Sequence, residues 1–451
     1  MTRRLVLLLL AALFIAFAAY GSFVPLRLRP MTFAEGVQRF VTTPFIPIAK
    51  ASGSDLVTNV LLFVPIGFFL LGGTASRSRT AALVLWLPVV VACIALSVGI
   101  ELGQVFIVGR TASWNDVFAE SLGGVIGSLA WLVCGNLVVD FLAPIASSES
   151  RTDRAFRLFG AYAALWILLG LVPFDYTLRP QEIAEKFRHG RIVLEPFAGA
   201  TVEDVIGTWL MAIPLGVFGV LAALHLRAPR PIAIALGLGI AVAVGIEAIQ
   251  VLAVSRTADV TDVAMNALGV TTGVFASSRW MGRAHDDAEQ EGVRLWPVAA
   301  LLVWCLVVVA RHWSPFDFVA DGAFVRRRIP MLLRVPFYSY YWSNALDAFT
   351  EATTKALLGV PVGGLLQATW TPKSREASVV QAAGITVLAG GFFLIIELGQ
   401  LLLPSRTPDQ TDIYIGTFGA IVGMLAVRLL TRRLLAPRED LTSPSPRPPG
   451  T

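Results

Sequence analysis

Ionisable and amide side chains recur at fixed spacing inside apolar stretches of this chain. A glutamate precedes a glutamine by three residues in three places, at Glu101-x-x-Gln104, Glu247-x-x-Gln250 and Glu397-x-x-Gln400. An arginine follows each glutamate by nine residues and an aspartate by fifteen, which gives Arg110, Arg256, Arg406, Asp116, Asp262 and Asp412. The glutamates are 146 and 150 residues apart, so the pattern indicates three tandem repeats of one unit.

Two kinds of role fit this spacing. A glutamate and a glutamine three residues apart share one face of a helix, and the arginine and aspartate fall where the next helix begins. A guanidinium can bind a phosphate or carboxylate through two hydrogen bonds, and the glutamate could carry a proton or act as a general base. The alternative is structural: the arginine and aspartate hold the hairpin together while the glutamate is bonded inside the bundle. The sequence leaves both open.

The three repeats differ at several polar positions. Each repeat has a Pro-x-Gly motif, and the residue six positions before its proline is Asn59, Thr208 or Lys355. Twelve residues after the glutamate stand Ser113, Asp259 and Asp409, and nineteen residues after it stand Glu120, Asn266 and Gly416. One repeat combines the fullest polar set, so repeat 2 is the best candidate for a functional pocket: Glu247, Gln250, Arg256, Asp259, Asp262 and Asn266.

Lys355 gives repeat 3 a cation where repeat 1 has an amide. An unpaired charge inside a membrane span costs about 2.5–3.5 kcal/mol on insertion scales. We therefore expect Lys355 to pair with Glu351, one turn earlier, or with Glu397 of the next helix. Such a pair would leave repeat 3 with a filled pocket.

The composition excludes a soluble protein. Of 451 residues, 55% are hydrophobic and only 15% are charged, well above the roughly 45–50% apolar usage of soluble domains. The net charge of +5 is spread between apolar stretches instead of forming one basic patch, so nucleic acid is not an expected partner. The expected surroundings are the lipid bilayer.

Twelve apolar stretches are long enough to cross a bilayer, which takes roughly 17–25 residues. They are Leu5–Tyr20, Leu56–Gly73, Ala81–Val108, Val117–Leu142, Leu158–Val172, Val205–Leu226, Ile232–Val254, Val263–Ser278, Leu295–Ala310, Ala348–Gln367, Val379–Leu403 and Ile413–Leu430. We predict an all-α integral membrane protein of about twelve transmembrane helices, arranged as three four-helix repeats over residues 1–143, 150–285 and 290–435. Residues 436–451 are rich in proline and serine and predict a disordered tail.

The charges of the short turns predict the orientation. Basic residues lie in the turns after the second and fourth stretch of a repeat, such as Arg77, Arg79, Arg227 and Arg230, which places those turns and both termini in the cytoplasm. The first stretch resembles a cleavable signal peptide, but its counterparts in the other two repeats are internal. We therefore expect a retained helix in the cytoplasmic membrane, with the arginine and aspartate of each repeat at the outer side.

The repeated positions include no evident nucleophile and no metal-binding motif. None of the four histidines lies at a repeated position, and no serine or cysteine recurs beside a base. The three cysteines, Cys93, Cys134 and Cys305, lack the paired spacing of metal ligands or disulfides. We expect no metal and no cofactor, and an enzyme is the least favoured class.

Glycine pairs start two turns into the last helix of each repeat, at Gly123 and Gly127, Gly269 and Gly273, and Gly419 and Gly423. Such pairs let membrane helices approach closely. Together with Asn59, six residues before the proline of a Pro-x-Gly motif, and with the Glu-x-x-Gln, arginine and aspartate positions, they resemble the VanZ-like family. The resemblance covers nearly the whole chain as three tandem units.

The resemblance implies a role in the cell envelope, because the family is named for a protein linked to teicoplanin resistance. The implied function is lowered sensitivity to glycopeptide-type antibiotics or the handling of an envelope lipid or glycan precursor. A transporter or flippase with a polar site between repeats is the competing interpretation, and a membrane-embedded hydrolase or transferase acting on a lipid-linked phosphate is the third. The sequence leaves the ligand and the oligomeric state open.

Overall fold

The computed structural model describes residues 2–47, 53–75, 77–147, 151–171, 176–254, 256–286, 295–342, 345–370 and 374–429. Within these residues the chain is almost entirely helical. Two short parallel strands pair with each other, β1 (Ile192–Val193) and β2 (Ala258–Asp259). The linkers at 148–150 and 287–294 and the tail at 436–451 lie outside the described residues, so the predicted repeat boundaries and the predicted disorder stay predictions.

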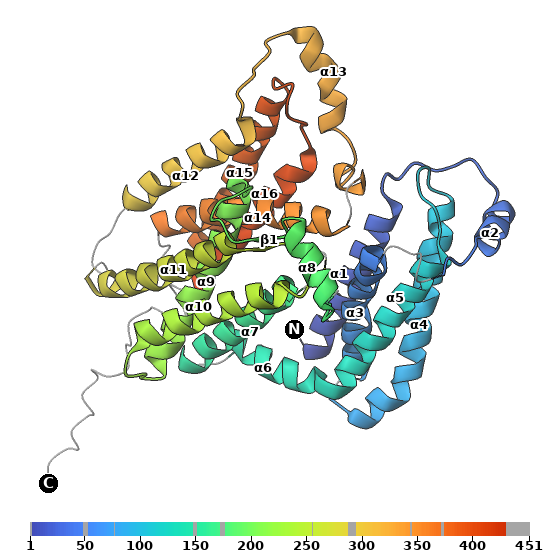
Figure 1. Cartoon of the computed structure of the whole chain (residues 1–451), viewed down its shortest axis with the longest axis horizontal. Coiled ribbons are helices and arrows are strands. Elements are labelled where there is room, and N and C mark those ends of the chain that lie inside the picture. The colour runs from blue at the N-terminus through green and yellow to red at the C-terminus, as the bar shows by residue number, and fades with distance from the viewer. Residues whose placement is uncertain are drawn as a thin grey trace.

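The long helices form three groups, which Figure 1 shows at the right (blue to teal), the lower left (green) and the top (yellow to red). Repeat 1 contains α1 (Arg3–Phe23), α3 (Gly53–Ala75), α4 (Arg79–Val105) and α5 (Trp114–Ala130), which continues through a π-helical turn (Trp131–Gly135) into α6 (Asn136–Ser147). Repeat 2 contains α7 (Arg151–Leu171), α9 (Val202–His225), α10 (Pro231–Gln250) and α11 (Val260–Asp286). Repeat 3 contains α12 (Leu295–Trp313), α14 (Ala345–Thr369), α15 (Arg375–Gln400) and α16 (Gln410–Leu429).

Each predicted stretch coincides with a helix, although α4, α10 and α15 end before the predicted ends at Val108, Val254 and Leu403. The all-α membrane fold in three repeats is confirmed. In the described residues, ten helices are both long and apolar enough to cross a membrane. The two long helices that miss this criterion are α11 and α14, whose polar residues lower their hydropathy. α14 lies centrally and packs against α3 of repeat 1 and α9 of repeat 2 as well as within its own repeat (Figure 1).

Glycines bring the second and fourth helix of each repeat into backbone contact. A methyl group on Gly127 would overlap the Val64 carbonyl, one on Gly273 the Ile213 carbonyl, and one on Gly423 the Val360 carbonyl. The glycine of each Pro-x-Gly motif faces the partner helix in the same way, so Gly67 lies against Gly124. The predicted close approach is therefore confirmed, and it fixes the register of the two helices that carry the variable polar residues.

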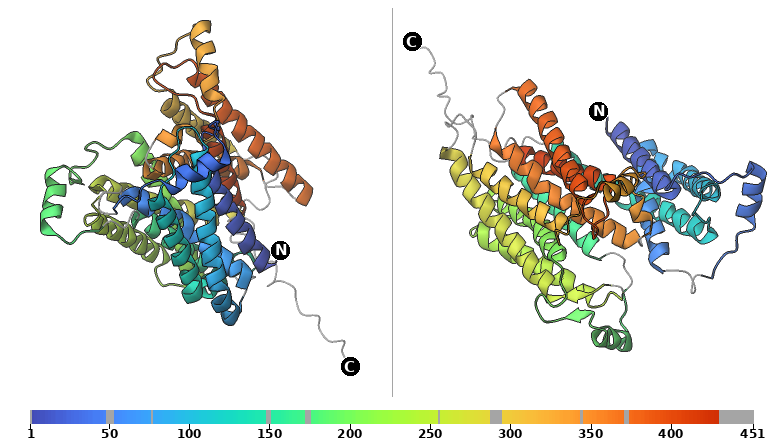
Figure 2. Two further views of the ribbon diagram at one scale, coloured as in Figure 1. Left: turned by 90° about the vertical axis from the view of Figure 1, so that its right-hand side faces the viewer. Right: turned by 90° about the horizontal axis from the view of Figure 1, so that it is seen from above.

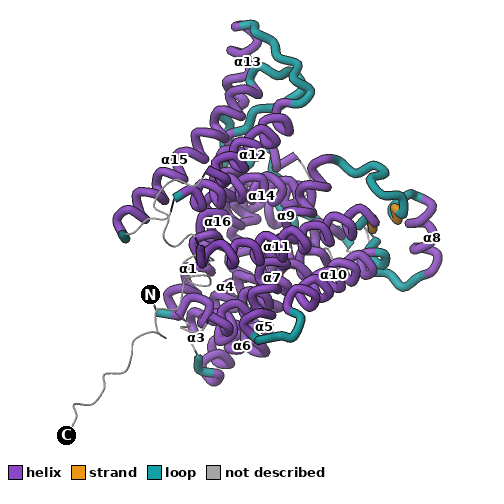
Figure 3. Tube along the Cα trace, turned by 90° about the vertical axis from the view of Figure 1, so that its left-hand side faces the viewer, coloured by secondary structure: helices purple, strands orange, loops and turns teal. Residues whose placement is uncertain are grey.

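A short helix precedes the second long helix of each repeat: α2 (Phe33–Val41), α8 (Pro180–Arg188) and α13 (Gly322–Leu332). Figure 3 shows α8 and α13 on loops that extend beyond the long helices, and α2 extends in the same way in Figure 2. A capping box begins α2, in which Thr32 donates to Glu35 from its backbone N–H and its hydroxyl and lowers the pKa of that carboxyl. Repeats 1 and 3 meet near these loops, where the Tyr20 hydroxyl donates to the Pro336 carbonyl at 2.9 Å.

Candidate functional site

The repeated glutamate ties the third helix of its repeat to the start of the fourth. Its Oε2 accepts the backbone N–H of the residue twelve positions later. The distances are 2.8 Å from Ser113 to Glu101, 3.3 Å from Asp259 to Glu247, and 2.8 Å from Asp409 to Glu397. The three glutamates are 1%, 8% and 1% exposed, respectively. A buried carboxylate thus takes up a backbone donor that begins a helix and would otherwise lack an acceptor.

The residues that donate to these glutamates are themselves helix caps. The Ser113 hydroxyl accepts from the backbone N–H groups of Asn115 and Asp116 at 3.1 and 3.4 Å. Asp259 Oδ1 accepts from the Thr261 N–H at 2.7 Å, and Asp409 Oδ1 accepts from the Thr411 N–H at 2.8 Å. Serine and aspartate are both strong N-cap residues, so a difference that seemed to separate repeat 1 from the others leaves this function unchanged.

The glutamine side chain donates a hydrogen bond to the glutamate in two repeats, but it has a different acceptor in the third. Gln104 donates to Glu101 Oε1 at 2.8 Å, and Gln400 donates to Glu397 Oε1 at 3.3 Å. In repeat 2, Gln250 instead donates to the carbonyl of Gly170 in α7 at 2.7 Å. The glutamine and glutamate are therefore hydrogen-bonded to each other in repeats 1 and 3.

The repeated arginine reaches the carboxyl end of the first helix of its repeat. Arg110 Nε donates to the Val24 carbonyl at 2.8 Å and Arg406 Nε to the Ser314 carbonyl at 2.7 Å. Arg256 donates to the Leu169 carbonyl at 3.5 Å. A cation at this end of a helix is favourable because the last carbonyls lack partners in the helix and the helix dipole is negative there. The pairing of Arg256 with Asp262 or Asp259 stays a prediction.

A second cation, which the sequence analysis missed, reaches the carboxyl end of the third helix. Arg29 donates to the Val105 carbonyl at 3.2 Å, Lys186 to the Gln250 carbonyl at 2.5 Å, and Arg328 to the Gln400 carbonyl at 3.3 Å. Arg29 lies in the loop before α2, whereas Lys186 lies in α8 and Arg328 in α13. Each repeat therefore has two cations on helix carbonyls at the same end of the bundle.

A second missed position anchors the loop that leads into the second helix. It is the second residue after the cap, Asn115, Thr261 or Thr411. The side chain oxygen of Asn115 accepts from the Ile46 N–H at 2.9 Å, and the hydroxyls of the two threonines accept from Phe197 and Phe337 at 2.8 Å. The backbone donor in these two repeats is the phenylalanine of a Pro-Phe pair, Pro196-Phe197 or Pro336-Phe337, and this recurring pair is the sequence signal that could have revealed the contact.

The aspartate of the fourth helix binds the residue six positions before the proline of the second helix. In repeat 1, Asn59 Nδ2 donates to Asp116 Oδ1 at 2.8 Å, and in repeat 2, the Thr208 hydroxyl donates to Asp262 Oδ1 at 3.1 Å. Both aspartates are half-buried. In repeat 3 the same structural position is occupied by Lys355. Asparagine, threonine and lysine thus occupy equivalent positions in the three repeats.

Lys355 forms an ion-pair cluster in repeat 3. Its Nζ lies 2.7 Å from Glu351 Oε1 and 2.7 Å from Asp412 Oδ2. The predicted pairing with Glu351 is confirmed, and the partner on a neighbouring helix is Asp412. The ring of Tyr340 lies 5.3 Å from the ammonium, and its hydroxyl donates to Asp412 Oδ1 at 3.3 Å. Burial and the nearby Asp412 raise the pKa of Tyr340, so the phenol stays protonated as a donor.

The residue one turn after this aspartate also differs between repeats. Glu120 accepts from the Ser97 hydroxyl at 2.7 Å in repeat 1. In repeat 3 the position is Gly416, against which the ring of Phe393 packs. In repeat 2 it is Asn266, 5% exposed, whose Oδ1 is buried without a hydrogen-bond donor among the described residues. The polar set of repeat 2 is therefore assembled at one end of its bundle, with one buried acceptor left over.

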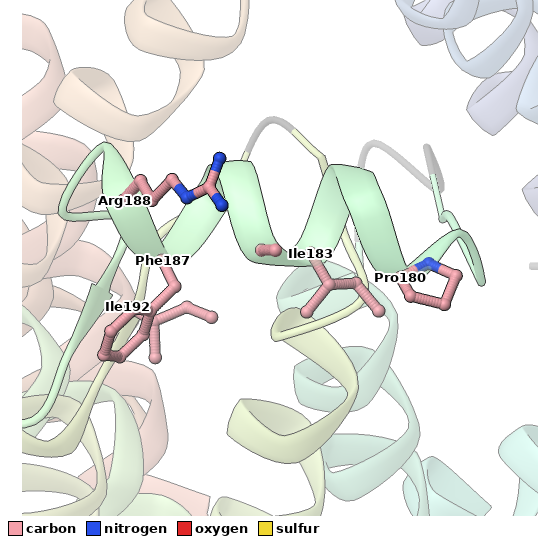
Figure 4. A pocket seen from close by; sticks show the side chains of 6 residues that line it. Pro180, Ile183, Phe187, Arg188 and Ile192 are labelled. Carbon is pink, nitrogen blue, oxygen red and sulfur yellow. The ribbon is translucent and has the colours of Figure 1, made fainter.

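Surface hollows lie elsewhere. One lies along α8 and is lined by Pro180, Ile183, Ala184, Phe187, Arg188 and Ile192 (Figure 4). Another lies between α15 and α16, beside Leu394 and Tyr414. Among the described residues, no group of three or more histidine, cysteine, aspartate or glutamate side chains could hold a metal ion.

Three tandem four-helix units, each with the same polar network at one end, define a multi-pass membrane protein built by repetition. The VanZ/LLP1 family matches residues 5–135, 159–281 and 297–431, so the chain belongs to this family and contains its unit three times. No curated protein and no solved structure matches the chain.

Proposed function

We propose that this protein acts in the cell envelope by binding an envelope lipid or glycan precursor at the polar ends of repeats 1 and 2, and that this binding lowers sensitivity to glycopeptide-type antibiotics. The chain lies in the cytoplasmic membrane with both termini in the cytoplasm. The polar end of each repeat then faces the outside, where such precursors are exposed.

One observation carries the proposal: the aspartate of the fourth helix has a neutral partner in repeats 1 and 2 and a lysine in repeat 3. The glutamate, cap and arginine contacts are common to all three repeats and fit a structural framework. The residue that contacts this aspartate changes from a neutral side chain in repeats 1 and 2 to a cation in repeat 3. Asp116 and Asp262 accept hydrogen bonds from neutral side chains, whereas Asp412 forms an ion pair with Lys355.

The network favours binding over catalysis. A general base or nucleophile needs a lone pair directed at the substrate. Oε2 of each repeated glutamate instead accepts a backbone N–H, and the arginines donate to helix carbonyls. Because these glutamates and arginines are already hydrogen-bonded to the backbone, they suit a preformed site that holds a ligand in place.

The test compares matched glutamate variants in the source cell. Glutamine retains an acceptor oxygen for the backbone N–H but removes the charge. Glu247→Gln should raise teicoplanin susceptibility to the level of a strain without the protein, at unchanged membrane abundance on an immunoblot. Glu397→Gln, in the filled repeat, should mainly lower abundance. Normal susceptibility at normal abundance in both variants would contradict the proposal, and equal loss for Glu101→Gln, Glu247→Gln and Glu397→Gln would show three working sites.

A further inference from the structure

Repeat 3 holds a primary ammonium group on its own side chain. Lys355 Nζ lies between Glu351 Oε1 at 2.7 Å and both oxygens of Asp412, at 2.8 Å from Oδ1 and 2.7 Å from Oδ2. An ammonium has three N–H donors, and here carboxylates accept them while the Tyr340 ring adds a cation–π contact at 5.3 Å.

The other two repeats have the same surrounding contacts but no lysine at this position. The backbone contacts between second and fourth helix, the glutamate bond to the cap and the arginine bond to the first helix recur in all three. At the position of Lys355, repeat 1 has Asn59 and repeat 2 has Thr208, each shorter than lysine and each a donor to the equivalent aspartate.

The aspartates also differ in how far they are covered. Only 9% of the Asp412 side chain is exposed, beneath Lys355 and Tyr340, whereas Asp116 and Asp262 are half-buried. Tyr340 stands four residues after Pro336, and the residue four positions after Pro196 in repeat 2 is Ala200. The site of repeat 3 is thus both filled and covered by its own side chains, while the residue at the same offset from the proline in repeat 2 has no ring.

Repeat 2 has a further acceptor beside this position. Asn266 follows Asp262 by one helical turn on the same face of α11. Only 5% of Asn266 is exposed, and its Oδ1 accepts no hydrogen bond among the described residues. A buried amide oxygen without a donor is costly, and a ligand N–H would satisfy it.

We propose that repeats 1 and 2 bind the primary ammonium group of a ligand over Asp116 and Asp262, in the position that Lys355 occupies in repeat 3. This inference rests on the proposed function for the place of the site and adds the chemistry of the ligand. The third repeat then keeps the shape of the site while its own side chain excludes the ligand.

The experiment measures the thermal unfolding midpoint of the full-length protein in detergent, with ethylammonium chloride as the probe. Sodium chloride and tetraethylammonium chloride at the same concentration control for ionic strength. A ligand that binds only the folded state raises the midpoint with its concentration, so ethylammonium should raise the wild-type midpoint by at least about 2 °C over sodium. Tetraethylammonium, which has no N–H donor, should give no more than sodium.

Substituted lysines test the position. Thr208→Lys should copy repeat 3 by placing an ammonium on Asp262, and it should reduce the ethylammonium response. Asn59→Lys combined with Thr208→Lys should abolish that response. Val202→Lys, at a 67% exposed position of the same helix, adds the same charge elsewhere and should keep the full response. Lys355→Ala should lower the midpoint in sodium, and ethylammonium should restore at least half of the loss.

Two results would overturn the inference: equal stabilisation of the wild type by all three salts, or a full ethylammonium response in the double lysine variant. The proposed function is judged separately by antibiotic susceptibility. If ethylammonium binding follows the prediction but Glu247→Gln leaves susceptibility normal, the function fails and the ammonium site stands. If Glu247→Gln abolishes the phenotype without any ethylammonium response, the ammonium site fails and the function stands.

Discussion

Lys355 and Asp412, 57 residues apart in the chain, form an ion pair of 2.7 Å between the second and fourth helix of repeat 3. The equivalent residues of repeats 1 and 2 meet at the same place as Asn59 with Asp116 and Thr208 with Asp262. One packing arrangement therefore supports either a neutral hydrogen bond or an ion pair, and this choice is the main difference between the repeats.

Removing the lysine of this pair should destabilise repeat 3. Lys355→Met leaves Asp412 buried without its cation, which typically costs about 3 kcal/mol of unfolding free energy. Lys355→Met with Asp412→Leu, which removes both charges, should recover much of that loss. Denaturant unfolding in detergent measures both variants. A single variant as stable as the wild type would show that the pair contributes nothing.

The arginine of repeat 2 can be tested by a double-mutant cycle. Arg256→Ala removes the bond to the Leu169 carbonyl, which for a charged donor should cost about 1.5–3 kcal/mol. If Arg256 also pairs with Asp262, the cycle with Asp262→Ala should give a coupling of at least about 0.5 kcal/mol. Strictly additive losses would show that the two side chains do not interact.

The helix contacts predict unequal effects of alanine at two glycines. Gly423→Ala would push a methyl group into the Val360 carbonyl and should lower the unfolding midpoint. Gly384→Ala is the matched control, because nothing lies within 4 Å of a methyl group there. It should stabilise its helix by up to about 1 kcal/mol. Equal tolerance of both changes would contradict the close contact.

The orientation predicts which cysteines an impermeant thiol reagent can reach in intact cells. Ser405 lies in an exposed loop at the polar end of repeat 3, and Thr80 is exposed at the opposite end of repeat 1. In a background without native cysteines, Ser405→Cys should react at once and Thr80→Cys only after lysis. The reverse pattern would invert the topology.

The sequence predicted the repeat, the helices and much of the site because these depend on spacing within one unit. The Glu-x-x-Gln motif and the aspartate have constant offsets, and Lys355 and Glu351 are close on any helix. The cations Arg29, Lys186 and Arg328 were missed because they stand 72, 61 and 69 residues before the repeated glutamate. Segments of unequal length separate them from the repeated motif, so no fixed period reveals them.

The contact between Lys355 and Asp412 could not be predicted for a different reason. It depends on the register of two helices separated by a third, and that register is set where Gly419 and Gly423 meet the backbone of α14. The sequence identifies glycines suited to close packing, but it does not state which carbonyls they meet. Three-dimensional packing therefore decides which residue neutralises the aspartate.

The central claim is that Asp116 and Asp262 can accept a ligand ammonium group at the position that Lys355 occupies in repeat 3. The most direct measurement is teicoplanin susceptibility of cells that express Asn59→Lys with Thr208→Lys, at wild-type membrane abundance, beside Val202→Lys. With lysines at both positions equivalent to Lys355, susceptibility should rise to that of a strain without the protein. The Val202→Lys variant should protect normally. Full protection by the double lysine variant would contradict the account.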